Sequence, residues 1–294
     1  GGSRARISGG NALSLPSRRV GIVTDSTADI PTQILQELDI RSVPALLTLD
    51  GRTFIDGHDL SRVEFYRRMP SLTHPPTTAS PSPIMFKEAY ERLLTSGVDQ
   101  ILSIHVSSKL SGMLNAAYQA AQEFGARVNL FDSQQLSLGL GYQVMEAARS
   151  ALKGLELQEI LNHVRAVKEN VKLLALINSL EYLRRGGRVS WLQAGVSELL
   201  KIKLLLTIKD GLVESFSRAR TFNRAMDILR REVHSWSPLN QLTVMHAGIE
   251  QRAEELAEEL QTLSDTTPMI VNVTTVIGAH VGPGSIGVAA LPKI

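Results

Sequence analysis

The sequence predicts an α/β protein of two domains, with a parallel sheet in the first and a mixed or antiparallel sheet with helices in the second. From residue 20 to residue 154, apolar segments of strand length alternate with helical segments, as is typical of a parallel sheet covered by helices. Beyond Gly154 two apolar runs flank Asp210-Gly211, a strong signal for an antiparallel hairpin. A chain of 294 residues is long enough for two domains, which we place at 20–154 and 155–294.

The first 19 residues differ in composition from the rest of the chain. They contain four arginines and many small polar residues, but no acidic residue and no apolar run of signal-peptide length. We therefore expect a disordered tail or a cloning remnant. The first ordered element should be the apolar stretch 19–25, a buried parallel strand. Asp29 is expected to cap a helix that begins at about Pro31.

The remaining elements of the first domain follow from hydrophobic periodicity and turn signals. A loop rich in Pro, Thr and Ser occupies 75–83. Strands are predicted at 42–49, 100–106 and 128–131, and helices at 61–69, 83–94, 108–124 and 136–152.

In the second domain the predicted strands and helices no longer alternate regularly. A Gly-rich loop is expected at 278–284, just before the last strand. Helices are predicted at 157–170, 180–185, 190–200, 221–235 and 250–263, and strands at 172–177, 203–208, 212–217, 242–246, 269–273 and 285–290. The strands at 203–208 and 212–217 should form the hairpin.

The composition excludes several classes of function. With 31 basic and 29 acidic side chains the formal net charge is +2, which gives no reason to expect nucleic acid as a partner. The chain has no cysteine, which excludes disulfides and thiolate metal sites and fits a reducing cytoplasm, where we expect the protein. No apolar run reaches the ~18 residues of a membrane span.

Common catalytic and cofactor motifs are missing, so we expect no metal and no cofactor. The sequence contains no P-loop, no H-E-x-x-H pair among its seven histidines and no G-x-S-x-G elbow. Residues 282–287 match G-x-G-x-x-G literally, but they lie at the end of the chain, where no βαβ unit can follow.

Two loops are unusually rich in hydroxyl groups. One spans 77–82 and includes Thr78 and Ser80; the other spans 107–112 and includes Ser107 and Ser111. Each precedes or begins a predicted helix, where backbone N–H groups and hydroxyls together suit an anion. Ordinary helix capping is the better explanation for each cluster if it is taken alone. Two clusters at the rim of one sheet, with a late histidine, favour a small anion site.

An ordered set of motifs resembles the DegV family and covers about residues 20–291. The matching segments are VGIVTDSTAD (20–29), PTTASPSP (76–83), SSKLSG (107–112), DS (132–133), LRRGGR (183–188), KIK (201–203), TIKDG (207–211), RT (220–221) and HVGPG (280–284). The resemblance implies a two-domain fold with one long-chain fatty acid, such as palmitate, stearate or oleate, buried between the domains.

The resemblance also implies roles for particular residues. Thr78, Ser111 and His280 would bind the carboxylate of the fatty acid. The residues implied near the headgroup, or in contact with a separate fatty acid kinase, are Arg220, Ser80, Ser107 and Arg188. The kinase subunit would phosphorylate the carboxylate, and this chain would be a carrier without catalytic activity that can touch a membrane transiently.

The sequence departs from the family pattern at four positions near the expected site. Ala79 and Ser80 replace the usual Ser-Gln of the Pro-rich loop, which puts some polar contacts in doubt. Met113 replaces a usual Thr and Leu204 a usual Pro, and both changes can reshape the tunnel. The tunnel walls are expected at 173–177 and 196–206.

The residue chemistry suits a carrier, but an enzyme remains the alternative. Two hydroxyls and an imidazole can give a carboxylate three hydrogen bonds without a costly buried ion pair. A hydrolase or transferase could instead use Ser111 and His280 as a dyad at the same place. Against this, no acid is evidently placed to orient His280. A sugar- or phosphate-binding module is a further alternative.

Overall fold

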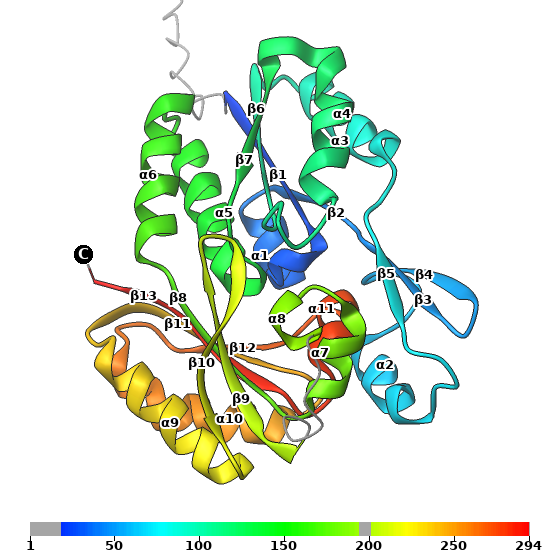
Figure 1. Cartoon of the computed structure of the whole chain (residues 1–294). Helices are drawn as coiled ribbons and strands as arrows, with labels where there is room; N and C mark the ends of the chain where they lie inside the picture. Colours follow the sequence, from blue (N-terminus) through cyan, green and yellow to red (C-terminus); the bar gives the residue numbers. More distant parts are fainter. Residues whose placement is uncertain (1–18, 194–200, 294) are drawn as a thin grey trace, which may run out of the picture.

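The computed structural model describes residues 19–193 and 201–293, which form three sheets covered by helices (Figure 1). One sheet has four strands, another has six, and a small third sheet has three. The predicted tail therefore lies outside the described residues, apart from Arg19. The chain has the α/β fold that the sequence predicts, with one parallel and one mixed sheet.

The four-stranded sheet is entirely parallel, in the order β2-β1-β6-β7. Its strands are β1 (Val20–Asp25), β2 (Ile40–Val43), β6 (Gln100–His105) and β7 (Val128–Asp132). All six residues of β1 are buried, as expected when helices cover both faces of a sheet. The helices around this sheet are α1 (Thr32–Glu37), α3 (Pro83–Thr95), α4 (Met113–Ala121), α5 (Ser137–Leu152) and α6 (Leu157–Asn170).

The prediction of one strand at 42–49 is wrong. The chain leaves the parallel sheet after Val43 and enters the three-stranded sheet at β3 (Leu46–Leu49). Pro44, which lacks an N–H for a sheet ladder, lies at the change. β3 pairs with β4 (Arg52–Ile55) and with β5 (Thr77–Ala79), which lies inside the predicted Pro-rich loop. The turn between β3 and β4 is Asp50-Gly51, and both residues have positive φ, a hairpin signal that sequence analysis overlooked.

The six-stranded sheet is mixed, in the order β10-β9-β8-β13-β11-β12. Only the β11–β12 pair is parallel. The strands are β8 (Lys172–Ile177), β9 (Lys203–Lys209), β10 (Leu212–Ala219), β11 (Leu239–His246), β12 (Met269–Asn272) and β13 (Ile286–Pro292). The predicted hairpin across Asp210-Gly211 is confirmed as β9–β10. Helices α9 (Phe222–Ser235) and α10 (Glu250–Leu260) lie along this sheet (Figure 1).

Three helix predictions need correction. The helix expected from Ser108 begins only at Met113, because residues 107–112 form a turn instead. Asp29 does not cap α1; it is buried, has a left-handed backbone (φ 57°), and bonds to a distant segment. The Gly-rich stretch expected as a loop at 278–284 belongs in part to helix α11 (Thr275–Val281), which ends at Gly282. Two glycines hide this helix from a propensity argument, whereas packing favours it.

Short helices complete the chain. Ser61 caps α2 (Arg62–Arg68) by accepting a hydrogen bond from Glu64 N. α7 (Leu180–Gly186) and α8 (Ser190–Gln193) precede the part of the predicted 190–200 helix that lies outside the described residues. Short 3₁₀ helices span Ser26–Ala28, Met69–Ser71, Gln122–Arg127 and Gln261–Leu263, and the third of these is interrupted at Gly125.

The largest hydrophobic core joins the parallel and the mixed sheet. It includes Ile22 of β1, Leu138 of α5, Leu173 of β8 and Met245 of β11. Because this core is continuous, the division into domains at residue 154 stays a prediction. A second core fills the space between the mixed sheet and helices α9 and α10. None of the helices described here is both long and apolar enough to cross a bilayer.

Candidate functional site

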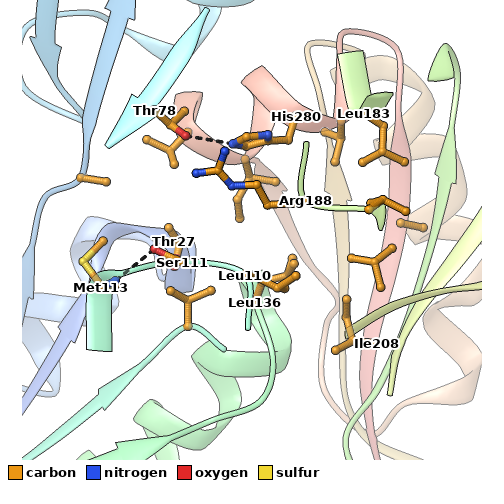
Figure 2. A pocket seen from close by; sticks show the side chains of 18 of the residues that line it. Thr27, Thr78, Leu110, Ser111, Met113, Leu136, Leu183, Arg188, Ile208 and His280 are labelled. Carbon is orange, nitrogen blue, oxygen red and sulfur yellow. Dashed lines mark hydrogen bonds between the residues drawn. The ribbon is translucent and has the colours of Figure 1, made fainter. Parts of the chain in front are cut away.

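A cavity of about 150 Å³ lies where the parallel sheet, the mixed sheet and helices α7 and α11 meet. Its walls are mainly apolar, and its polar groups gather at one part (Figure 2). The lining residues labelled in Figure 2 are Thr27, Thr78, Leu110, Ser111, Met113, Leu136, Leu183, Arg188, Ile208 and His280. Segments from β5, the 107–112 turn, α7 and α11 thus converge on one space.

Thr78 and His280 form one side of the polar part, which we call the mouth. Thr78 Oγ1 of β5 and His280 Nε2 of α11 lie 2.9 Å apart, within hydrogen-bonding distance. The guanidinium of Arg188 points toward both side chains (Figure 2). Arg188 also donates a hydrogen bond to Gly186 O at 2.9 Å, which fixes it beside α7.

Hydroxyl groups form the opposite side of the mouth. Ser111 and Thr27 lie across the cavity from Thr78 and His280 (Figure 2). Ser111 Oγ accepts a hydrogen bond from Met113 N at 3.2 Å and lies 3.5 Å from Ser80 Oγ. Ser111 therefore bonds to the first backbone N–H of α4 and also lines the cavity, so the bond at the helix start does not remove its hydroxyl from the cavity.

Burial keeps the His280 ring neutral at pH 7. Burial, together with the positive charge of Arg188, lowers its pKa to about 4. Nδ1 is buried and has no hydrogen-bond partner within the part of the chain that the structure describes. It lies so close to Gly186 that a Cβ there would come within 2.2 Å of it. With its proton on Nε2, the ring can donate a hydrogen bond into the mouth.

The charge at the mouth favours an anion. Arg188 is the one charged side chain among the described residues that line the cavity, and no carboxylate lines it. Hydroxyl groups of Thr27, Thr78, Ser80 and Ser111 belong to residues that line the same space. The described residues hold no cluster of three or more His, Asp or Glu side chains suited to a metal ion.

The apolar wall follows from strand alternation. Leu173, Ala175 and Ile177 of β8 line the cavity, while Leu174 and Leu176 belong to the core beneath α9. On β9, Leu206 and Ile208 line the cavity as well. Every second residue of the predicted wall 173–177 therefore lines the cavity. Of the predicted wall 196–206, residues 196–200 lie outside the described chain.

A second, apolar cavity of about 50 Å³ adjoins the first. The two cavities share Leu173, Ala175 and Ile177 as lining residues, and the smaller one continues toward β11 and β13. The apolar space therefore extends away from the mouth along the same face of the mixed sheet, from β8 toward β13 and β11. Such a shape suits a ligand with one polar end and a long apolar body.

Two residues proposed near the headgroup do not line the cavity. Ser107 is fully buried, and its Oγ donates a hydrogen bond to Gly211 O at 2.7 Å, so it joins the β6 end to the β9–β10 turn. Arg220 is exposed and follows Ala219, at the end of β10 opposite the Gly211 turn. Thr78, Ser80, Ser111, Arg188 and His280 do line the same cavity.

Sequence reasoning missed Thr27 as a lining residue. It lies at the carboxyl end of β1, where a parallel sheet commonly binds its ligand. Its hydroxyl donates a hydrogen bond to the buried Asp25, which also accepts from Val106 N and contacts His105 Nδ1 at 2.9 Å. The sequence signal that could have identified Thr27 is its place within the motif VGIVTDSTAD (20–29).

The dyad required by the enzyme alternative is not formed. His280 Nε2 faces Thr78, and Ser111 bonds to Met113 N and approaches Ser80 instead. No described carboxylate contacts the ring to orient it. The side chains are arranged as hydrogen-bond donors around a cavity, and not as a nucleophile beside its general base.

Comparison with protein families identifies the chain. The family model described as "Uncharacterised protein, DegV family" matches residues 19–293. This chain belongs to the DegV family. A DegV domain-containing protein of Staphylococcus aureus is 35% identical over 276 residues, which cover 92% of this chain and 98% of the relative.

Solved DegV structures share the fold over almost the whole chain. A DegV family protein from Thermus thermophilus, described as fatty acid binding, has a TM-score of 0.86 at 31% identity and covers 94% of this chain and 100% of its own. DegV from Bacillus subtilis, described as a fatty acid binding protein, has a TM-score of 0.81 at 28% identity, with the same coverage. The family and fold predicted from the motifs are therefore confirmed.

Proposed function

We propose that this protein binds a single long-chain fatty acid and presents its carboxylate to a separate fatty acid kinase, which forms the acyl phosphate. The carboxylate would lie at the mouth, bound by Thr78, Ser111 and His280, with Arg188 beside it. The acyl chain would fill the apolar cavity along β8 and β9. Palmitate, stearate and oleate are the expected ligands, and this chain would not catalyse the phosphorylation itself.

One observation carries the proposal: an apolar cavity ends in a mouth with several donors, one cation and no described carboxylate. A carboxylate can accept hydrogen bonds there from neutral groups, so its charge is satisfied without a deeply buried ion pair. The descriptions of the Thermus thermophilus and Bacillus subtilis relatives as fatty acid binding support the same ligand class.

Most of the affinity would come from the acyl chain. Burying about fourteen methylenes contributes about 11 kcal/mol of gross transfer free energy. The loss of translational and rotational freedom offsets several kcal/mol of this gain. Retention during purification would therefore rest mainly on the acyl chain, and each mouth contact would add a smaller share of the affinity.

The position of the mouth supports the proposal that a separate kinase phosphorylates the carboxylate. Arg188 is exposed and lines the cavity, so a partner can approach the carboxylate beside it. Arg220 is also exposed, at the remote end of β10, and we keep it as a proposed kinase contact rather than a headgroup contact. A guanidinium suits phosphate-bearing or acidic partners through paired hydrogen bonds.

Mass spectrometry of an organic extract tests the ligand directly. Protein purified from bacteria should release about one C14 to C18 fatty acid per chain, and lipid-stripped protein should take up the same acids. The proposal fails if folded protein carries no lipid and cannot be loaded. Incubation with ATP and fatty acid should give acyl phosphate only when a kinase subunit is added.

A further inference from the structure

The segment that leads into α11 is held by side chains from residues 29–66. Four consecutive residues, 272–275, take part: Asn272 and Val273 through their carbonyl groups, and Thr274 and Thr275 at the start of the helix. The binding side chains are Asp29, Asp56, Arg62 and Tyr66. We call these four side chains the α11 clamp.

Asp29 contributes two hydrogen bonds to the clamp region. Its Oδ1 accepts from Thr274 N at 2.8 Å, and its Oδ2 accepts from Ser137 Oγ at 2.7 Å. Arg62 Nη1 lies 3.5 Å from Oδ1. The Asp29 side chain is completely buried, so these contacts replace water around its charge.

Asp56 binds the two threonine hydroxyls that open α11. Thr274 Oγ1 donates to its Oδ2, and Thr275 Oγ1 donates to its Oδ1 at 2.8 Å. Asp56, Thr274 and Thr275 are all buried. Tyr66 adds a bond to Val273 O at 2.8 Å, and its ring lies against Gly278, where a Cβ would come within 2.3 Å of the hydroxyl.

The other end of α11 reaches the mouth. His280 follows Thr275 by five residues, about one and a half helical turns. It is fixed there by close approach to Gly186 and by Thr78, and α11 packs along α7. None of Asp29, Asp56, Thr274 and Thr275 lines the cavity, so the two threonine hydroxyls can act on a ligand at the mouth only through α11.

We propose that Asp29 and Asp56 are positioning residues, which set the place of His280 at the mouth by holding the start of α11. This inference rests on the proposed function, because His280 is taken to bind the carboxylate. The clamp contains two carboxylates, Arg62 as its cation and the Tyr66 hydroxyl, and Ser137 of α5 faces Asp29. Shifting a rigid seven-residue helix at one end displaces the side chain at the other.

Removing the two hydroxyls without altering the shape of the helix tests the clamp. The double variant Thr274→Val/Thr275→Val leaves both carboxylates in place and does not touch the cavity wall. It should speed fatty acid dissociation about tenfold, approaching the effect of His280→Ala. The reason is that displacing the His280 ring disturbs one hydrogen bond to the charged carboxylate of the fatty acid. Thr274→Ser/Thr275→Ser keeps the hydroxyls and should restore wild-type dissociation.

Thr243→Val is the matched control for lost stability. Thr243 lies on β11, is equally buried, and does not line the cavity. Its hydroxyl bonds to the hydroxyl of Tyr142 on α5, at 2.6 Å and away from α11. This variant should lower the melting temperature, by less than the double variant because no buried carboxylate loses its donors, and should leave fatty acid dissociation unchanged. Equal acceleration in both variants would mean that lipid release follows global stability, and the inference would be overturned.

A double-mutant cycle gives the sharper result. In a His280→Ala background the two Thr→Val changes should have no further effect on dissociation, because their route passes through that ring. Additive effects overturn the inference.

Amide hydrogen exchange of 276–282 in lipid-free protein provides a separate readout: the Thr→Val pair should exchange faster than Thr243→Val. If wild type binds no fatty acid, the proposed function fails, while this exchange measurement still decides whether the clamp holds α11.

Discussion

The wall and the mouth of the cavity are built in different ways. A large part of the wall comes from one strand pair, β8 and β9, in which alternate apolar side chains face the same space. The mouth assembles single side chains from β5, the 107–112 turn, α7 and α11, which are far apart in the sequence. The wall therefore tolerates small errors in any one contact, whereas the mouth depends on how several segments meet.

The largest effect should come from filling the wall. Ala175→Trp introduces a side chain comparable in volume with the cavity, so it should abolish fatty acid loading. Loading is measured by mass spectrometry, with folding checked by circular dichroism. Leu174→Met, on the opposite face of β8, is the control and should load normally. Normal loading of the Trp variant would place the acyl chain elsewhere.

Single donors at the mouth should have smaller effects. Ser111→Ala and Thr78→Ala each remove one donor to a charged acceptor, which weakens binding by roughly 1.5–3 kcal/mol, about ten- to hundredfold. Dissociation rates of a fluorescent fatty acid report the loss. The double variant retaining wild-type exchange would show that these hydroxyls serve only the backbone, as Ser111 does for Met113 N.

Acid should lower the free energy of unfolding through His280 at the mouth, but not through Asp29 of the α11 clamp. His280 has a pKa lowered to about 4, so its contribution to the free energy of unfolding is present above about pH 6.5 and is lost as the pH falls toward 4. Asp29 has a pKa raised by burial to about 6, so it contributes most below about pH 3.8 and loses that contribution as the pH rises through 6.

These opposite signs can be separated in lipid-free protein. In His280→Asn the loss of stability between pH 6.5 and pH 4 should shrink by ~2 kcal/mol, whereas in Asp29→Asn it should grow. Urea unfolding at a series of pH values measures both. Parallel curves for wild type and His280→Asn would contradict a neutral buried ring.

The smallest effect on retention should come from Arg220. Because it is exposed and does not line the cavity, Arg220→Ala should keep the fatty acid but slow phosphorylation by an added kinase. Arg218→Ala, another exposed arginine at the same end of β10, is the control. Loss of bound lipid in Arg220→Ala would instead assign this residue to binding.

The same contrast explains what could be predicted from sequence. The wall at Leu173, Ala175 and Ile177 follows from a run of apolar residues and the two-residue period of a strand. The mouth residues came from ordered motifs, because no periodicity brings Thr78 beside His280. Helix α11 was expected as a loop, since Gly278 and Gly282 lower its helix propensity, while Asp56 and Tyr66 stabilise it from far along the chain. Long-range hydrogen bonds of this kind leave no local pattern.

Strand β8 carries one further consequence. Its two neighbours fix its register, with Ala175 opposite Leu206 on one side and Gly287 on the other. Slipping by a single residue would turn Leu174 and Leu176 into the cavity and leave Ala175 facing α9. Ala175 lines both cavities and Gly287, which has no side chain, lines the smaller one. Backbone pairing therefore decides the space open to a ligand at this row as much as side-chain choice does.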